Sequence, residues 1–169
     1  AFLFGFPPCD DLAVSGAKHW AAKLAADPDC QRRAADRAKL CATIADLLGC
    51  PYVVENPRGA LVRLWRPRDH VFDPCDFGGW IPAREARHPR WPDYIPPRDA
   101  YTKETYLWTG NGFVMPPARR VEPIVIEYAN GKRGAPQWAK LGGKSQKTKN
   151  IRSATPRGFS RAVFEANAR

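Results

Sequence analysis

The chain has 169 residues, 44% of them hydrophobic, and carries a net charge of +10. This hydrophobic content excludes a wholly disordered protein, and no apolar run approaches the roughly 20 residues that cross a bilayer, so no membrane partner is expected. The length predicts a single domain over 1–169. The five cysteines form no CxxC pair and have no histidine at zinc-ligand spacing. This usage predicts reduced thiols in an intracellular compartment and no metal site.

Residues 1–57 begin with a predicted strand and two predicted helices. The apolar residues 3–6, closed by two prolines, predict a short buried strand. Helices are expected over 17–26 and from about residue 30 to Leu48, the second with Asp27 or Asp29 as its N-cap.

The second helix is predicted to bury one face and to lead into a second strand. Its apolar residues recur at steps of three and four, namely Ala34, Ala38, Cys41, Ile44, Ala45 and Leu48. Gly49 would end the helix, and the β-branched residues 52–54 predict a strand after it. Strand, long helix and strand in this order predict a right-handed βαβ crossover, hence a parallel sheet and an α/β fold.

Residues 58–100 and 101–169 have a different character. Eight of the 17 prolines fall between Pro57 and Pro97, together with Trp65, Trp80 and Trp91, which predicts an ordered loop excursion pinned by aromatic side chains. Beyond it, strands are expected over 103–108 and 121–128, and a basic loop over 129–154. Thr155-Pro156 would cap a last helix, with an apolar face of Phe159, Ala162, Val163 and Ala166.

The positive charge is concentrated near the C-terminus. No acidic residue lies between Glu127 and Glu165, whereas nine basic ones do. They are Lys132, Arg133, Lys140, Lys144, Lys147, Lys149, Arg152, Arg157 and Arg161. A solvated surface is the ordinary meaning of a charge run. A run as one-sided as this one favours a polyanion partner, such as a nucleic acid backbone.

Reactive residues follow both strands of the βαβ unit. The first strand leads through Pro7 and Pro8 to Cys9, and the second leads into Glu55 and Asn56. Because the carboxyl ends of parallel strands meet at one edge of a sheet, a thiol and a carboxylate are expected to converge there. A nucleophile beside a proton donor is what covalent catalysis needs.

These residues carry a resemblance to a known family. Gly5-Phe6-Pro7-Pro8-Cys9, with Ser15 downstream, resembles the Pro-Cys loop of the DNA cytosine-5 methyltransferases, and Glu55-Asn56-Pro57 resembles their Glu-Asn-Val motif on the next strand. A closer similarity, to phage-encoded methylase-like proteins, extends over 12–16, 105–108 and 152–159. The resemblance covers most of the chain and implies a partial Rossmann-like methyltransferase sheet.

The resemblance implies a covalent mechanism on cytosine. Cys9 would add to ring carbon 6 and Glu55 would assist at ring nitrogen 3, after which carbon 5 can accept a methyl group. The target base would be flipped out of duplex DNA. The other implied contacts are Pro8, Ser15, Asn56 and Pro57 with the substrate, and Lys144, Lys147, Lys149 and Arg152 with DNA phosphates.

The implied methyl donor is S-adenosylmethionine, but the chain departs from the family where the donor binds. No Gly-rich turn follows a strand and opens a long helix, so the main donor pocket is expected outside this chain. It would lie in a missing upstream segment or a separate subunit, or donor binding would be lost. Thr155 and Pro156 resemble the family's last motif, which packs beside the donor. The region available for target recognition is also much shorter than in the family.

Two other functions stay open. One is a non-catalytic DNA-binding relative that keeps the fold and the basic surface, and the other is an enzyme that modifies pyrimidines at the nucleotide level. In the first, Cys9 is an inert buried thiol and Glu55 merely ends a strand. The three tryptophans of the excursion are expected to be packing anchors. The resemblance implies the cytoplasm of a phage-infected or prophage-carrying bacterium.

Overall fold

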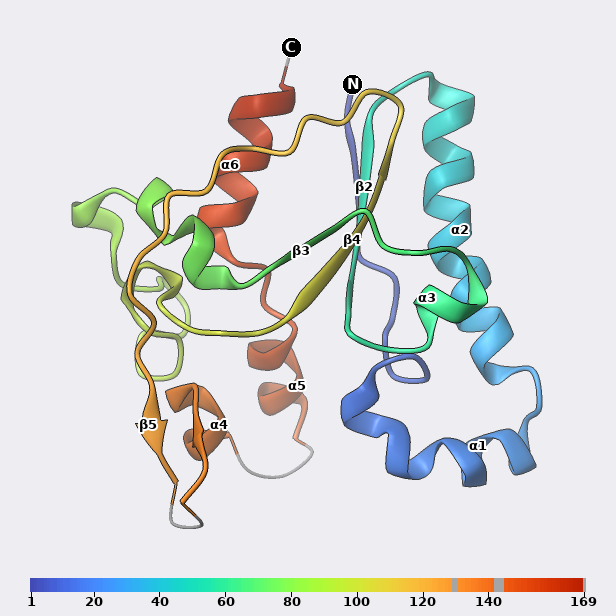
Figure 1. The fold of residues 1–169 in the computed structure, drawn as a ribbon, viewed down its shortest axis with the longest axis horizontal. Helices are drawn as coiled ribbons and strands as arrows, with labels where there is room; N and C mark the ends of the chain where they lie inside the picture. Colours follow the sequence, from blue (N-terminus) through green and yellow to red (C-terminus); the bar gives the residue numbers. More distant parts are fainter. Residues whose placement is uncertain (129–130, 142–144, 169) are drawn as a thin grey trace. The chain divides into compact units, whose positions relative to one another are not determined.

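The computed structural model describes residues 1–128, 131–141 and 145–168, and the chain divides into two compact units (Figure 1). Unit 1 comprises Ala1–Phe72, Glu104–Val114 and Asn167–Arg169, and unit 2 comprises Asp73–Lys103 and Met115–Ala166. Across the described ranges, no helix combines the length and the apolar character needed to span a membrane. No disulfide joins the cysteines in this part of the chain.

Unit 1 is built on a four-stranded sheet. Its strands are β1 (Leu3–Gly5), β2 (Tyr52–Pro57), β3 (His70–Phe72) and β4 (Thr105–Gly110). They lie in the order β1-β2-β4-β3. β1 and β2 are parallel, while β4 is antiparallel to both β2 and β3. Three strands therefore share one direction and β4 opposes them.

The prediction of a parallel sheet is confirmed only for β1 and β2. Their parallel pairing joins Leu3 to Tyr52 and Gly5 to Val54, with a long helix between the two strands. The chain returns from unit 2 before it forms β4, and nothing in the composition of β4 encodes its direction. The fold is a mixed α/β arrangement, and β3 was not predicted from the sequence.

The long helix α2 (Cys30–Leu48) has the predicted bounds. Asp29 occupies the N-cap position, although its side chain makes no capping hydrogen bond. Gly49 adopts a φ of 58°, the left-handed conformation that ends many helices and suits a residue without a Cβ atom.

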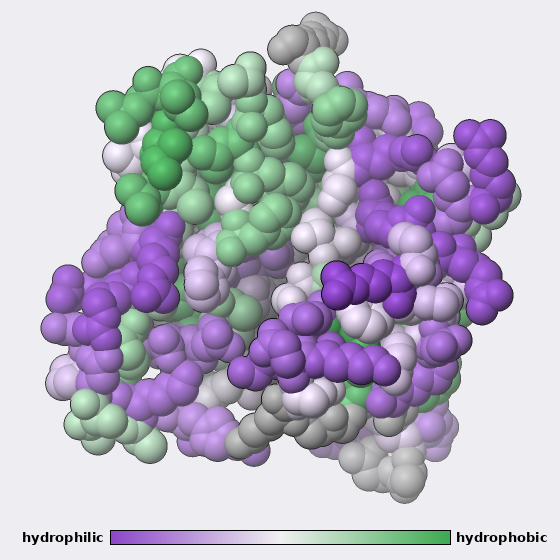
Figure 2. All heavy atoms as spheres, turned by 180° about the vertical axis from the view of Figure 1, so that it is seen from behind, coloured by the Kyte–Doolittle hydropathy of each residue, from purple (hydrophilic) through white to green (hydrophobic). Residues whose placement is uncertain are grey.

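The predicted buried face of α2 is wrong for two of its six residues. The buried positions include Ala34, Ala35, Ala38, Ala42 and Ala45, whereas Cys41 is half-buried. Small residues line this face because α2 lies close to the sheet: a Cβ atom on Gly5 would come within 2.9 Å of Cys41 Sγ. Ile44 and Leu48 are exposed instead, with Leu40 and Leu47, and Figure 2 shows a hydrophobic area over the part formed by α2 and β1.

Three short helical segments complete unit 1. The segment before α2 is a 3₁₀ helix, η1 (Val14–His19), followed by α1 (Trp20–Ala26), so the single helix predicted over 17–26 is wrong in its first turn. α3 (Leu61–Leu64) follows β2, in the stretch expected to be an irregular excursion.

The centre of the sheet is formed by β2 and β4. Val54 and Trp108 are fully buried, and the Trp108 indole N–H donates to the Arg66 carbonyl at 2.9 Å. The ring of Trp65 stacks on that of Trp108 with their centroids 6.0 Å apart. Trp65 is thus a packing anchor, as predicted for the tryptophans of the excursion.

Unit 2 contains short elements around two small cores. They are η2 (Pro74–Trp80), η3 (Ala83–Glu85), η4 (Pro97–Asp99), β5 (Ile126–Glu127), β6 (Arg133–Gly134), α4 (Pro136–Lys140), α5 (Gln146–Arg152) and α6 (Arg157–Asn167). The final helix matches its prediction, because Phe159, Ala162 and Val163 are buried. Phe159 meets Phe77 edge to face at 5.1 Å.

Two predictions for unit 2 are wrong. The strand expected over 121–128 is reduced to β5, because Pro123 lacks an N–H and the Ile124 N–H donates to the Ala100 carbonyl instead. The loop expected over 129–154 contains β6, α4 and α5. α5 forms because the Ser145 hydroxyl accepts the Thr148 N–H at 3.1 Å and Ile151 enters an apolar cluster.

A carboxylate closes the turn before β3. Asp69 accepts the Thr109 N–H at 2.7 Å and pairs with Arg66 at 2.8 Å. Burial acts to raise the pKa of Asp69, but the hydrogen bonds from Arg66 and Thr109 outweigh it and leave the pKa below its usual value. Asp69 therefore stabilises the folded chain in its ionised form.

We predict that Asp69→Asn lowers the free energy of unfolding at pH 7 by about 1–2 kcal/mol. A carboxyl whose folded pKa is lowered contributes fully above its unfolded pKa, near 3.9, and the contribution is lost as the pH falls through the folded pKa. Thermal unfolding by circular dichroism should show a gap between variant and wild type that shrinks below about pH 4. Asp36→Asn, on the exposed side of α2, should have little effect at either pH.

Candidate functional site

The two loops that follow β1 and β2 are joined to each other. The side-chain amide of Asn56 donates to the carbonyl of Pro7 at 3.2 Å, and the Val14 N–H donates to the Arg58 carbonyl at 2.9 Å. The Ala60 N–H donates to the Leu12 carbonyl at 2.8 Å. These bonds hold the Pro-Cys loop against the end of β2.

Gly59 allows this close approach. It forms an isolated antiparallel bridge with Ala13. A Cβ atom at position 59 would lie 1.9 Å from the carbonyl oxygen of Leu12, much closer than two atoms can pack. A residue without a side chain is therefore required where the two loops cross.

Cys9 lies at the start of a tight turn. Its carbonyl accepts the N–H groups of Leu12 and Ala13 at 3.0 and 2.9 Å, which fixes the backbone directly after the thiol. The residue is half-buried, and the preceding Pro8 is exposed. The loop that carries the thiol is therefore held at two points, by the hydrogen bond from Asn56 to Pro7 and by this turn.

The strand predicted over 52–54 would have placed Glu55 beyond its end. In the structure Glu55 lies within β2. β2 continues through Pro57 because Glu55, Asn56 and Pro57 pair with Leu107, Tyr106 and Thr105 of β4. Neighbouring side chains of a strand point to opposite faces. Asn56 lies on the same face as Val54, which packs with α2, so Glu55 lies on the other face.

Both polar residues of this strand are partly or wholly removed from water. Glu55 is half-buried and its Oε1 atom is buried. Asn56 is only 1% exposed, and its Oδ1 atom has no hydrogen-bond partner among the described residues. Buried polar atoms usually have partners, so an orphaned amide oxygen at this point marks a position where a ligand or solvent donor would be favourable.

The remaining predicted substrate residues have different positions. Ser15 is exposed in η1, two residues after the Ala13–Gly59 bridge. Pro57 is half-buried at the end of β2, opposite Thr105.

Sequence reasoning missed a charged cluster at the start of β4. The Tyr106 hydroxyl donates to Glu104 at 2.7 Å, and Arg58 lies 3.7 Å from the same carboxylate. The Arg68 guanidinium lies over the Tyr106 ring at 4.4 Å. Burial, with the hydrogen bond to Glu104, raises the pKa of Tyr106. The signal in the sequence was weak, because these residues come from three separate segments.

The residues predicted to contact DNA phosphates lie in unit 2. They were expected on a loop, and this prediction is wrong for every one of them that the structure describes. Lys147, Lys149 and Arg152 lie on α5, whereas Lys144 lies outside the described residues. The Lys147 ammonium is 5.0 Å from the centre of the Tyr94 ring, and Arg152 donates to the Leu141 carbonyl at 2.7 Å. α5 therefore has basic residues on its exposed side.

Thr155 and Pro156, the residues predicted to lie beside the methyl donor, belong to unit 2. The Pro156 carbonyl accepts from the Ser160 N–H and hydroxyl, while Thr155 is half-buried. The Gly158 N–H, in the first turn of α6, donates to Asp99 at 2.9 Å. Burial raises the pKa of Asp99.

The described residues do not fit a main donor pocket. Gly78 and Gly79 lie in η2, where a Cβ atom would strike Arg98 or Arg119, and Gly112 lies in the turn after β4. None of these glycines stands between a strand and a long helix, which is the arrangement that binds a nucleotide-like cofactor.

Comparison with protein-family models, with curated proteins and with solved structures finds no match. The structure shows a mixed α/β chain in which the Cys9 loop is hydrogen-bonded to the end of β2, the strand that contains Glu55.

We predict that Gly59→Ala destabilises the chain by about 1–3 kcal/mol, because the Leu12 backbone must move to accommodate the new methyl group. Gly16→Ala is the matched control, since its Cβ atom would lie 3.7 Å from the nearest atom, the Asp10 carbonyl oxygen. Thermal unfolding and the alkylation rate of Cys9 report on the fold and on the thiol loop. Equal unfolding temperatures for the two variants would contradict the described crossing of the loops.

Proposed function

We propose that this chain is the cytosine-activating part of a DNA cytosine-5 methyltransferase, with Cys9 as nucleophile and Glu55 as acid. The observation that supports this proposal most is the joining of the Cys9 loop to the end of β2 through Asn56, Gly59 and Ala60. Such joining anchors the loop of the proposed nucleophile beside the strand that carries Glu55, at an edge of the kind where ligands of α/β proteins bind.

The chemistry begins with the thiolate of Cys9. It forms a bond to carbon 6 of cytosine, and the electrons of the 5,6 double bond shift toward ring nitrogen 3. Glu55 delivers a proton to that nitrogen, and carbon 5 becomes nucleophilic. After carbon 5 has gained a substituent, a base removes its proton, the carbon–sulfur bond breaks and the thiolate leaves. Ring nitrogen 3 then returns its proton to Glu55.

Asn56 serves as a positioning residue in this proposal. Its amide N–H holds the Pro7 carbonyl, so the loop has a defined path from β1 to Cys9. Pro8 directly precedes Cys9, and its fixed φ angle stiffens the loop. Pro57 has no N–H, so β2 can end there without a further hydrogen bond between strands.

The methyl donor, S-adenosylmethionine, is bound in this proposal by another polypeptide unit beside β1. One reversed strand in an otherwise parallel sheet is compatible with a Rossmann-like arrangement. β1 is an edge strand of the described sheet, yet Phe2-Leu3-Phe4-Gly5-Phe6 has none of the charges that protect edges. Leu47 of α2 is 83% exposed, and Figure 2 shows a hydrophobic area over α2 and β1. Apolar surface of this kind supports an α/β partner that continues the sheet.

The substrate of the proposal is duplex DNA with the target cytosine flipped out. The exposed lysines of α5, together with the excess of basic residues, support binding to phosphates. Reduced cysteines, nucleotides and DNA occur together in the bacterial cytoplasm, which is the proposed location.

We predict that the chain alone exchanges the hydrogen on carbon 5 of cytosine. In D₂O, addition of Cys9 to carbon 6 lets carbon 5 take a deuteron, and the reverse step releases the original proton and the thiolate. This cycle needs no methyl donor. Mass spectrometry of the nucleosides from a cytosine-containing duplex should show deuterium in wild type, none with Cys9→Ser, and at least about tenfold less with Glu55→Gln.

Cys41→Ser is the matched control for this experiment, because Cys41 is also half-buried and lies on α2, and burial raises its pKa. It should exchange as wild type does. Exchange that survives Cys9→Ser would exclude the proposed nucleophile. DNA binding by wild type without any exchange would favour the non-catalytic relative, and exchange on free dCMP alone would favour a nucleotide-level enzyme.

A second prediction concerns α5. Lys147→Gln with Lys149→Gln should lower the salt slope of DNA binding by about two, since each lost phosphate contact removes about 0.9 from the slope. Any sequence preference should be retained, because phosphate contacts carry none. Fluorescence anisotropy at several salt concentrations measures both quantities. An unchanged slope would mean that the α5 lysines are only a solvated surface.

A further inference from the structure

We propose that a hollow beside the Cys9 loop, lined by Trp20, Arg58 and Arg63, binds one nucleotide of the DNA strand that carries the target cytosine. This inference rests on the proposed function, since it assigns a second contact to the same substrate. The hollow lies wholly within unit 1 and has a volume of about 310 Å³. Small-molecule sites begin at roughly this size.

The walls of the hollow come from the two joined loops and the helices next to them. Val14 stands in the loop that follows Cys9, and Arg58, Gly59 and Ala60 follow β2. The Val14 N–H donates to the Arg58 carbonyl at 2.9 Å, so a hydrogen bond joins two of the lining residues. The hollow is therefore built by the contact that also positions the thiol loop.

The lining combines apolar surface with two cationic side chains. The surface of the hollow is almost wholly apolar, and no acidic residue lines it among the residues described. A nucleotide could match both parts of this lining, because its base has a flat apolar face and its phosphate is an anion. Stacking on an aromatic ring accepts any base.

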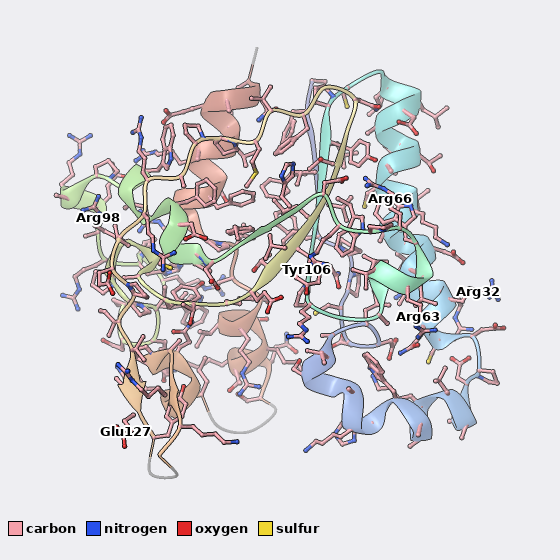
Figure 3. The ribbon with its side chains drawn as sticks, in the orientation of Figure 1. Arg32, Arg63, Arg66, Arg98, Tyr106 and Glu127 are labelled. Carbon is pink, nitrogen blue, oxygen red and sulfur yellow. The ribbon has the colours of Figure 1, made fainter. Side chains whose placement is uncertain are left out.

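Both arginines have free capacity for an anion. The side chain of Arg58 is 63% exposed and lies 3.7 Å from Glu104, beyond hydrogen-bond distance. Arg63 is exposed, extends from α3 (Figure 3), and meets Gln31 only at 3.5 Å. Guanidinium groups bind phosphate with two parallel hydrogen bonds, and few of these donors are used within the protein.

Trp20 adds an observation that is independent of charge. Its indole nitrogen Nε1 is buried and has no acceptor among the described residues. Buried indole N–H groups usually find a partner. Because this nitrogen is buried, Trp20 presents its ring and not its N–H to the hollow, and the ring can stack on a base.

The position of the hollow selects a nucleotide of the target strand. Its wall begins at Val14, two residues after Leu12, whose N–H is bonded to the Cys9 carbonyl. A strand whose cytosine reaches Cys9 passes this wall with an adjoining nucleotide. Phosphate contacts at such a point fix the register of the strand on the protein.

The test compares three variants with wild type on one cytosine-containing duplex. Arg58→Gln with Arg63→Gln should lower the salt slope by about two and the affinity by about tenfold at fixed salt. Trp20→Leu should lower the affinity by about tenfold and leave the salt slope unchanged. Arg37→Gln with Lys39→Gln, on the exposed side of α2, removes the same charge and should change neither quantity. Circular dichroism confirms that every variant is folded at the temperature used.

The outcomes separate this inference from the proposed function. If wild type binds DNA and exchanges the carbon 5 hydrogen, but the arginine pair behaves as the α2 control does, the hollow is not a nucleotide site and the proposed function stands. If wild type neither binds nor exchanges, both ideas fail. Tighter binding of dCMP than of the duplex, lost in the arginine pair, would overturn the assignment to a DNA strand in favour of a free nucleotide.

Discussion

The crossing of two loops at Gly59 is the constraint on which the candidate site depends. The loop after β1 and the loop after β2 approach until the Leu12 carbonyl lies where a side chain at position 59 would begin. The N–H groups of Val14 and Ala60 form hydrogen bonds across the crossing. The Asn56 amide holds the first loop nearer to its start, at the Pro7 carbonyl. A loop anchored at several points loses little further entropy when substrate binds, which favours an oriented nucleophile.

The same crossing links stability to the proposed chemistry. A parallel pair of strands places its two following loops at one edge, but it does not by itself hold them together. Here backbone hydrogen bonds supply the connection, and small residues make it sterically possible. The hollow beside Trp20 is lined by residues of the same crossing, namely Val14, Arg58, Gly59 and Ala60.

Hydrophobic surface is distributed unevenly over unit 1. The buried face of α2 consists mainly of alanines, and its exposed residues include Leu40, Leu47 and Leu48. The edge strand β1 contains Phe4, with Phe2 and Phe6 close to its two ends. Phe4 and Phe6 stack at 4.4 Å, so much of the apolar area of β1 is shared among its own side chains. An edge without protecting charges invites another strand, and the proposal of a donor-binding unit beside β1 uses this feature.

The sequence by itself determined the local elements of the first 57 residues and the pairing of β1 with β2. The helix of residues 30–48, its glycine end and the short apolar strands have strong local signals, and a crossover helix between two strands leaves parallel pairing as the natural outcome. The final helix was predictable for the same reason, since its apolar face repeats at helical spacing.

The tertiary structure alone decided strand direction, the buried face of α2 and the course of the basic segment. The direction of β4 depends on the path of the chain through unit 2, which no periodicity encodes. The alanine face of α2 is chosen by the close approach of the helix to Gly5, where leucines do not fit. Contacts between residues distant in sequence also join Asn56 to Pro7 and Gly59 to Ala13, so the sequence could suggest Cys9 and Glu55 but not the loop crossing that holds the Cys9 loop.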